Sequence, residues 1–331
     1  MSSRRRITTL PTTLSLALAA LLFAATGRAP GAPPARKGDA DHWRSLETLL
    51  EQAVERASAS TVAIVTSTSA NGVRLRTGTA VTEGLVLTDA TFLEGLAEPI
   101  TVIDAQGRRF EAHRAGLDQR LRIAALRVSS GALVGVERAP PARPGLFAIA
   151  CGRARPGSRR ATPTLGIISA IGRFSGRATQ VSCKLSTANA GGPVVDLDGR
   201  AFGVAIRLTR RTGDDSGVGF CVPWSMINPI LPALADGAQL RAAELGLLVP
   251  EQDLPGTRGV PIVAVRSGGP AARTQLCEGD LIVGLDDAQI DRLEDLSRAV
   301  AKLIGGQTIK LRIERSGRRF EVEFETKTRA P

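Results

Sequence analysis

The chain has 331 residues, which exceeds one average domain and is enough for two domains with separate cores. Its formal net charge of +11 is carried mostly by arginine, while aromatic residues make up 3% and tyrosine is absent. Basic grooves that bind single-stranded nucleic acid also present aromatic rings for stacking, so this composition argues against a nucleic-acid partner. We interpret the arginines as a solvated surface, with attraction to acidic proteins or lipid head groups as the alternative.

Residues 1–28 have the pattern of a signal peptide. Arginines at positions 4–6 precede an uncharged run over residues 7–27, which is centred on LSLALAALLFAA and ends in small residues. The run also approaches the length of an uncleaved membrane anchor, and Ser3-Arg4-Arg5 forms a partial twin-arginine signal. All three alternatives predict an extracytoplasmic, periplasmic chain that is either soluble after cleavage or tethered to the membrane by residues 7–27.

Residues 29–41 are rich in proline, alanine and glycine and predict a flexible linker. After them, apolar side chains recur at helical spacing and predict a short amphipathic helix at Trp43, Leu46, Leu50, Val54 and Ala57. We favour packing on the core as the role of this helix, and contact between subunits is the alternative.

Between residues 61 and 223 short β-type runs alternate with turn signals. The runs are TVAIVTS, GLVLTD, PITVIDAQG, RIAALRV, LFAIA, LGIISAIG, TQVSCKL, GPVVDLDGRAFGVAI and VGFCVP. Many short strands without long helices between them predict an all-β barrel or sandwich. The segments DAQG at 104–107 and DLDG at 196–199 predict hairpin turns in which glycine takes a positive φ.

The C-terminal third has a different pattern. Residues 226–243 predict a short helix and a connector, followed by LGLLV, GVPIVAV, GDLIVGLDDAQI, the helical LEDLSRAVAKLI and the hairpin QTIKLRIERSGRRFEVEFET. Strands on both sides of one helix predict a small α+β module. We therefore expect a mainly β chain, with one domain over residues 42–228, a connector over 229–239 and the module over 240–327.

The cysteines predict no metal site. They show no CxxC spacing, and the chain has only two histidines, so zinc is not expected at Cys151, Cys183, Cys221 and Cys277. In an oxidising compartment these thiols could pair. No nucleotide or flavin motif occurs, so we expect no cofactor.

Residues 186–206, STANAGGPVVDLDGRAFGVAI, resemble the GNSGGP nucleophile turn and following hairpin of trypsin-fold proteases, especially the HtrA family. GTAVTEGLVLTDATFL is similar to that family's GSG…G.ILTN.HVV segment, DQRLRIAALRV to its D…DLAVLKV, LGIISAIGR to its GIVSAIGR and GVGFCVP to its GIGFAIP. The resemblance covers most of residues 46–225 in the right order. It implies a trypsin-like double β-barrel.

The positions that align with the family's catalytic residues are unsuited to catalysis. The general-base histidine falls on Thr91, the orienting aspartate on Arg122 and the nucleophilic serine on Ala190, while the oxyanion turn has Ala188 in place of glycine, followed by Asn189. Threonine accepts no proton near neutral pH, arginine would repel an imidazolium, and alanine has no nucleophile. The resemblance therefore implies a catalytically inactive homologue, a pseudoprotease.

Other residues offer little replacement chemistry. We expect His113 at an exposed strand position and His42 ahead of the domain, and a Ser-Lys dyad of Ser186 and Lys184 is disfavoured because Ser186 is not expected at the tip of the turn. For Cys183 and Cys221 the resemblance implies neighbouring antiparallel strands, which is compatible with a cross-strand disulfide or with two buried thiols.

The segment GGPAARTQLCEGDLIVGLDD is similar to the SPAAKAGLKEGDVILAIDG of the PDZ domain that follows the protease domain in HtrA proteins, with Gln275 in place of one glycine. A PDZ groove captures a C-terminal carboxylate with backbone amides, and the peptide adds a strand to the sheet. The resemblance places this groove at Leu245, Gly246, Leu247, Leu248, Val249, Leu296 and Val300. The two helical residues among them could equally be core residues.

The resemblance thus implies a non-catalytic protein that binds C-terminal or unfolded peptide segments of other proteins, as an adaptor, regulator or holdase in extracytoplasmic protein quality control. The alternatives are a weak or unconventional serine-type endopeptidase and a non-catalytic subunit of a mixed oligomer with active HtrA relatives. A homo-oligomer also stays open.

Overall fold

The computed structural model describes residues 37–67, 73–92, 99–129, 133–153, 158–207 and 218–329. The chain divides into two units, residues 1–48 and residues 49–331. The predicted signal or anchor segment over residues 1–28 and the first part of the predicted linker lie outside the described residues. Within the described ranges no helix is long and apolar enough to span a membrane.

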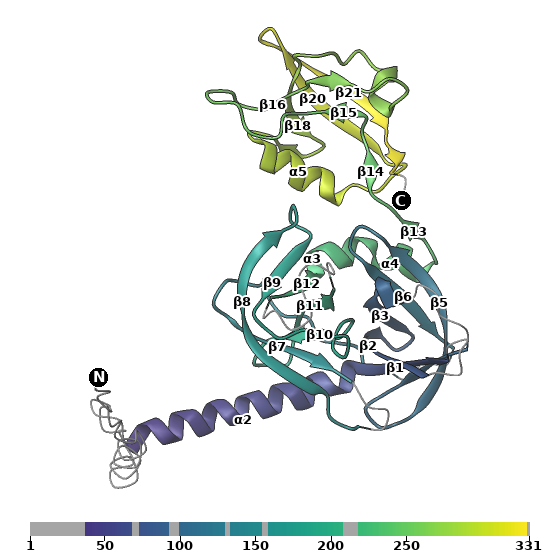
Figure 1. The fold of residues 1–331 in the computed structure, drawn as a ribbon, viewed down its shortest axis with the longest axis vertical. Helices are drawn as coiled ribbons and strands as arrows, with labels where there is room; N and C mark the ends of the chain where they lie inside the picture. The colour runs from purple at the N-terminus through teal and green to yellow at the C-terminus, as the bar shows by residue number, and fades with distance from the viewer. Residues whose placement is uncertain are drawn as a thin grey trace, which may run out of the picture. The chain divides into compact units, whose positions relative to one another are not determined.

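The first described element is helix α2, Lys37–Ser60, which begins inside the predicted linker (Figure 1). No proline lies between Pro34 and the end of this helix at Ser60, so nothing prevents the helix from starting ahead of the predicted position. Ala53 and Ala57 are buried in the core and Leu50 and Val54 pack against it, which confirms the packing role for this part of the helix. Trp43 is 66% exposed.

The first barrel consists of β1 Thr61–Ser67, β2 Val73–Thr82, β3 Leu85–Asp89, β4 Ile100–Ile103, β5 Arg109–Asp118 and β6 Ile123–Val128. They follow the order β5-β4-β1-β2-β3-β6, and antiparallel pairing of β5 with β6 closes the barrel. The one-turn helix η1, Ala90–Phe92, follows β3, and the short strand β13, Gln239–Leu240, pairs in parallel with β5.

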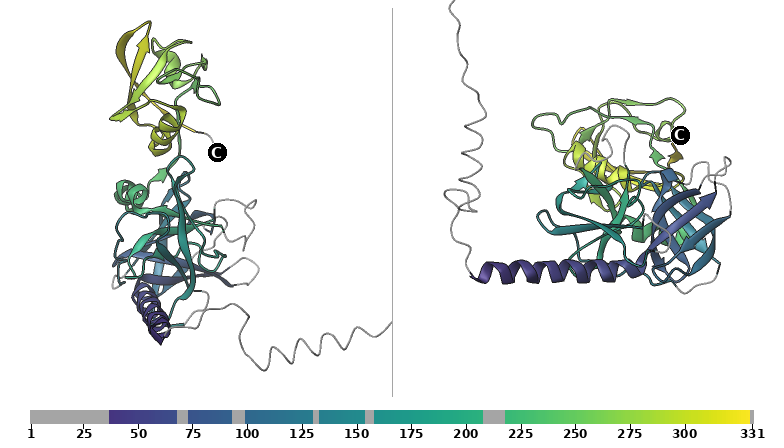
Figure 2. Two further views of the ribbon diagram at one scale, coloured as in Figure 1. Left: turned by 90° about the vertical axis from the view of Figure 1, so that its left-hand side faces the viewer. Right: turned by 60° about the horizontal axis from the view of Figure 1, so that its bottom comes forward.

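The second barrel consists of β7 Phe147–Gly152, β8 Thr162–Arg173, β9 Ala178–Val181, β10 Pro193–Val195, β11 Ala201–Ile206 and β12 Gly219–Pro223. They close in the order β10-β11-β12-β9-β8-β7. The two predicted hairpin turns are confirmed: Gly107 (φ 82°) lies between β4 and β5, and Gly199 (φ 76°) lies between β10 and β11. Figure 2 shows the strands curving around each barrel.

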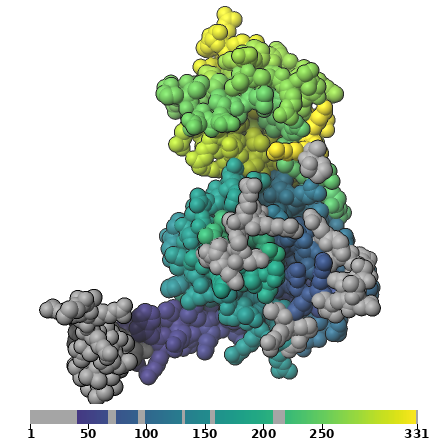
Figure 3. All heavy atoms as spheres, in the orientation of Figure 1, coloured from purple at the N-terminus to yellow at the C-terminus, as the bar shows by residue number. Residues whose placement is uncertain are grey.

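Side chains fill the interiors of both barrels. One core cluster draws residues from strands of each barrel, and two further clusters lie within the single barrels. On the face drawn in Figure 3 the atoms of the blue segments lie directly against those of the teal segments. The mainly β, trypsin-like double barrel predicted from the sequence is confirmed.

A run of short helices follows the second barrel: α3 Trp224–Ile227, η2 Asn228–Ile230 and α4 Leu231–Ala235. The C-terminal module then contains β14 Ala243–Glu244, β15 Leu247–Leu248, β16 Val260–Pro261, β17 Ala264–Val265, η3 Pro270–Arg273, β18 Leu281–Leu285, β19 Ala288–Gln289, α5 Leu293–Lys302, β20 Thr308–Arg315, β21 Arg318–Glu325 and β22 Lys327–Thr328. Its sheet has the order β16-β18-β20-β21, and it encloses its own apolar core.

Candidate functional site

The GGP turn between β9 and β10 is held by its glycines. Gly191 has a φ of 89°, and a Cβ atom there would collide with the carbonyl oxygen of Thr77 on β2. A Cβ atom on Gly192 would collide with the carbonyl oxygen of Cys151 on β7. Both positions therefore accept only glycine, because the obstructing atoms belong to the backbone of other strands.

Two threonine hydroxyls of the first barrel anchor the same turn. Thr79 Oγ1 donates to the carbonyl oxygen of Gly191 at 3.0 Å, and Thr77 Oγ1 donates to that of Ala188. The amide of Arg153 donates to Thr77 Oγ1 at 2.7 Å. The turn is thus a hydrogen-bonded junction between the two barrels, a structural role that requires no catalysis.

The amides at the tip of the turn are engaged within it. Ala188 N donates to Ser186 Oγ at 3.1 Å, and Ala190 N donates to the carbonyl oxygen of Ser186, also at 3.1 Å. Ala188 is one of the two positions that the resemblance assigns to the oxyanion turn, and Ala190 is the position of its nucleophilic serine. In this conformation neither amide is directed at a substrate oxygen, and Ala190 itself is only 4% exposed.

Asn189 locks the segment leading into the turn. Its Oδ1 accepts the amide of Ser186 at 2.7 Å, and its Nδ2 donates to the carbonyl oxygen of Lys184 at 3.2 Å and to Thr164 Oγ1 at 3.4 Å. Asn189 is only 4% exposed, so these bonds form away from bulk water. Ser186, the disfavoured alternative nucleophile, therefore has a structural role, in which its amide, hydroxyl and carbonyl groups all form hydrogen bonds within the turn.

The structure brings the positions that align with the triad together. The amide of Ala90 donates to the carbonyl oxygen of Arg122 at 2.8 Å, which places Thr91 next to the segment that carries Arg122. Gly191, the neighbour of Ala190, lies against the amide nitrogen of Asp89. The alignment therefore picks out residues that are neighbours in space, although Thr91 and Ala190 are 99 positions apart in the sequence.

Asp89 is a polar residue of this site that the sequence reasoning missed. It is 2% exposed, and its carboxylate accepts the amide and hydroxyl of Thr91 and the amide of Arg207. Asp89 stands where the quoted family motif has asparagine, and this difference in the sequence could have identified it as a residue of the site. Thr91 is thereby fixed as a hydrogen-bond donor to a buried acid, the opposite of a general base.

Positive charge gathers beside Asp89. Burial and then the charges of Arg74 and Arg207 lower the pKa of Arg76, and the charge of Asp89 partly offsets them. The Arg76 guanidinium lies over the ring of Phe92, 5.1 Å from its centroid. A catalytic histidine must become positively charged during acyl transfer, and this arginine-rich setting would oppose that step.

The two histidines lie on other elements. His42 is exposed on α2, and His113 is exposed on β5 as expected, with its Nε2 3.8 Å from Glu111 Oε1. Neither belongs to β2, β3, β7 or β11, which are strands that contact the turn. In the described part of the chain no group of three or more histidine, cysteine, aspartate or glutamate side chains could hold a metal ion.

All four cysteines are free thiols in the structure. Cys221 pairs with Thr179 across β12 and β9, whereas Cys183 lies two residues beyond the end of β9, so the two cysteines are not directly opposite each other. Cys183 Sγ donates to the carbonyl oxygen of Ala148 at 3.2 Å. Of the two alternatives from the sequence, the structure has the buried thiols, and burial raises the pKa of Cys221 to about 12.

The expected peptide groove is a cavity of about 600 Å³ that is lined mostly by the C-terminal module, with Arg120, Ser175 and Arg177 from the preceding domain at its edge. Six of the seven expected residues line it: Leu245, Gly246, Leu247, Val249, Leu296 and Val300. The seventh, Leu248, is 45% exposed and absent from the lining, because successive side chains of β15 point to opposite sides. β15 pairs on one side with β17, and Gly246 has a φ of 74°.

Comparisons with known proteins agree with this geometry. Residues 70–204 match the model of the trypsin-like peptidase domain, and residues 237–326 match that of the PDZ domain. The periplasmic pH-dependent serine endoprotease DegQ of Escherichia coli K12 is 27% identical over 73% of this chain and 56% of its own length. The probable periplasmic serine endoprotease DegP-like of Chlamydia trachomatis is 27% identical over 72% and 51%. The chain thus spans about half the length of these curated relatives.

Solved structures show the same architecture. A structure of the HtrA-type protease AlgW with a tripeptide is 26% identical, with a TM-score of 0.71 over 85% of this chain and 98% of that one. The serine endoprotease from Yersinia pestis is 25% identical, with a TM-score of 0.65 over the same shares. The chain thus has a trypsin-like peptidase domain followed by a PDZ domain, and it is similar in fold and sequence to HtrA-type proteases.

Proposed function

We propose that this chain is a catalytically inactive HtrA-type protein that binds C-terminal or unfolded peptide segments through its PDZ domain, outside the cytoplasm. It acts as an adaptor, regulator or holdase. The observation that carries the proposal is the state of the degenerate site: three neighbouring positions hold Thr91, Arg122 and Ala190, and the two turn amides are bonded to Ser186.

The size of the catalytic loss supports inactivity. In serine proteases, loss of the nucleophile or the base alone lowers turnover on the order of 10⁶-fold, about 8 kcal/mol of barrier. Here both functions are missing, and Thr91 donates its hydroxyl proton to Asp89 instead of accepting one. Peptide binding can outlast this loss, because strand addition uses backbone groups and an apolar groove rather than a nucleophile.

The groove residues support binding of a peptide end. The loop Leu245-Gly246-Leu247 lies at the groove, and α5 contributes Leu296 and Val300 on the other side. The carbonyl oxygen of Gly246 already accepts the amide of Arg266 at 2.8 Å, so the loop is fixed in shape before any peptide arrives. A preformed loop lowers the entropic cost of binding.

The proposed location combines two observations. The N-terminal sequence has a signal pattern, and the relatives named above are periplasmic proteases by name. Both favour an extracytoplasmic site of action in protein quality control.

Hydrolysis of casein tests inactivity. The mature natural chain, an Ala190→Gly variant and a variant restored with Thr91→His, Arg122→Asp, Ala188→Gly and Ala190→Ser are assayed together, beside an active HtrA protease. We expect the first two to match the blank and to resist labelling by a fluorophosphonate. Cleavage by the natural chain that Ala190→Gly leaves unchanged would contradict the proposal, whereas cleavage by the restored chain alone would show that only the triad was missing.

Fluorescence polarisation with peptides of free or amidated C-terminus tests binding. We expect the natural chain to prefer the free carboxylate. Val300→Lys, which places a charge in the groove, should abolish binding, while Leu254→Lys, at an exposed position absent from the groove lining, should not. Equal binding by both variants, or indifference to amidation, would assign any peptide affinity to another surface.

A further inference from the structure

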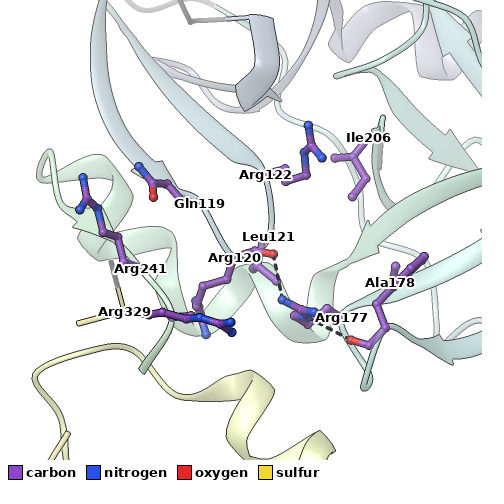
Figure 4. Close-up of a pocket in the computed structure, with 11 residues that line it drawn as sticks. Gln119, Arg120, Leu121, Arg122, Arg177, Ala178, Ile206, Arg241 and Arg329 are labelled. Atoms are coloured by element: carbon purple, nitrogen blue, oxygen red, sulfur yellow. Dashed lines mark hydrogen bonds between the residues drawn. The ribbon is translucent and has the colours of Figure 1, made fainter. Parts of the chain in front are cut away.

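A second cavity, of about 350 Å³, is lined mainly by arginines. They come from the segment after β5, from the turn between β8 and β9, and from the two ends of the PDZ region: Arg120, Arg122, Arg177, Arg241 and Arg329. In Figure 4 the side chains of Arg177 and Arg329 extend toward the space beside Arg120, whereas those of Arg122 and Arg241 extend away from it. The lining contains no acidic side chain. We refer to this cavity as the arginine pocket.

Arg120 forms a fixed wall of the arginine pocket. Its side chain is 2% exposed, and its Nη2 donates to Asp118 Oδ2 at 2.7 Å. Its Nη1 donates to the carbonyl oxygen of Lys302 at 2.7 Å and to that of Leu303 at 3.1 Å. This guanidinium is therefore fully occupied, and its charge is partly balanced by one buried carboxylate.

Arg177 is positioned but not neutralised. Its Nε donates to the carbonyl oxygen of Phe174 at 3.0 Å and its Nη1 to that of Arg120 at 3.5 Å. Burial, followed by the charge of Arg120, lowers the pKa of Arg177; Asp118 opposes the shift and Arg329 adds to it. Burial is the main cause of this lowered pKa, and two of the three neighbouring charges that act on Arg177 are positive.

Arg241 and Arg329 complete the pocket. In the described part of the chain, the side chain of neither residue forms a hydrogen bond or an ion pair, while their backbone groups are engaged at Gly305 and Ala242. Their guanidinium groups therefore retain their full donor capacity. Several guanidinium groups around one cavity repel each other unless an anion separates them.

We propose that the arginine pocket binds a doubly charged oxyanion of the phosphate type, either free or as the head of a phosphate monoester. A guanidinium donates two parallel hydrogen bonds to such an anion. A phosphate has enough oxygens to accept hydrogen bonds from several arginines at once, whereas a single carboxylate has only two oxygens. The volume leaves room for part of an ester group. This site goes beyond the proposed function, because phosphate binding requires neither a peptide nor the Leu245-Gly246-Leu247 loop. It adjoins the peptide groove, and Arg120, Arg177, Ala242 and Arg329 line both cavities.

Isothermal titration of the mature full-length chain with inorganic phosphate, at constant ionic strength in chloride, tests the site. The pocket variant Arg241→Met/Arg329→Met is compared with Arg273→Met/Arg318→Met, which removes the same charge from positions outside the pocket lining. We expect one saturable site in the natural chain and the matched variant, and binding weakened about tenfold or more in the pocket variant. Arg241→Lys/Arg329→Lys should recover part of it.

Two further arms separate the sources of the anion. Glycerol phosphate probes a soluble monoester, and vesicles with or without phosphatidic acid probe a lipid head group; preference for either identifies the source. The absence of saturable binding at millimolar phosphate overturns the proposal, as does equal binding by the pocket and matched variants. Tighter binding of succinate or of an acidic peptide than of phosphate would also overturn it, by showing a carboxylate site.

Discussion

Replacing Gly191 with alanine tests whether the GGP turn is maintained by packing between the barrels. The residue has a φ of 89°, and an added Cβ would meet the Thr77 carbonyl oxygen. Gly107 provides the matched control, since its φ is 82° and nothing lies within 4 Å of an added Cβ. Positive φ alone costs about 1–2 kcal/mol for an alanine, and crowding in a packed core adds about 1–3 kcal/mol. We expect Gly191→Ala to lose about 2–5 kcal/mol of unfolding free energy and Gly107→Ala only about 1–2 kcal/mol.

Urea unfolding followed by tryptophan emission measures both losses. The chain has two tryptophans, Trp43 and Trp224, and the second is 5% exposed with its Nε1 2.7 Å from the carbonyl oxygen of Ala201. In a Trp43→Phe background, emission therefore reports on the core shared by the two barrels, and unfolding of the PDZ module is silent. If Gly191→Ala destabilises the chain no more than Gly107→Ala, the proposed role of the turn as a packed junction is refuted.

The remaining predictions concern thiols, the turn and the PDZ module. Cys277 is exposed, whereas the other three cysteines are buried, and burial raises the pKa of Cys183 to about 11 and the pKa of Cys151 and Cys221 to about 12. Iodoacetamide at pH 8 should therefore add one label by mass spectrometry, and two or more labels would contradict the burial. Because the unfolded thiols ionise near pH 9, barrel stability should fall as pH rises from about 9 toward 12, which urea unfolding over that range checks. Asn189→Ala removes the side-chain bonds that hold the turn and should cost about 1–3 kcal/mol in the Trp224 assay, with an unchanged midpoint counting against that role. Hydrogen bonds from Arg315 lower the pKa of Asp280, so the stability they contribute is present above the unfolded pKa near 3.8 and is lost as the pH falls. The difference in melting temperature between the natural and Arg315→Met chains, measured by circular dichroism, should therefore shrink from pH 7 to pH 3.

Much of the fold could be predicted because its signals are local. The run TVAIVTS became β1 without a change of boundary, and both Asp-to-Gly turns are hairpins. β2 was missing from the list of predicted runs, because its second half, TGTAVT, consists of small residues that a hydrophobic pattern does not register. These residues are small because the strand faces the GGP turn, and that contact joins positions more than 100 residues apart.

The candidate site was predictable only in part, for a related reason. Alignment with a family motif located Thr91, Arg122 and Ala190, and the structure brings them together. No motif indicated that Ser186 accepts the turn amides, since that depends on the local backbone path. The arginine pocket was equally hidden, because its members come from four separate segments and each one reads in the sequence as an ordinary surface arginine.

The buried surroundings of Ala190, which offer no general base, favour a methyl group over a hydroxyl at this position. A serine hydroxyl at a position 4% exposed needs an acceptor, and in an active protease the histidine supplies one. Here Thr91 already donates to Asp89, so it offers no general base, and an unpaired buried hydroxyl would cost about 1–3 kcal/mol. Once the histidine is absent, alanine is the residue that the packed turn tolerates best. The glycines beside it have no such freedom, because their contacts with Thr77 and Cys151 belong to the barrels rather than to the reaction.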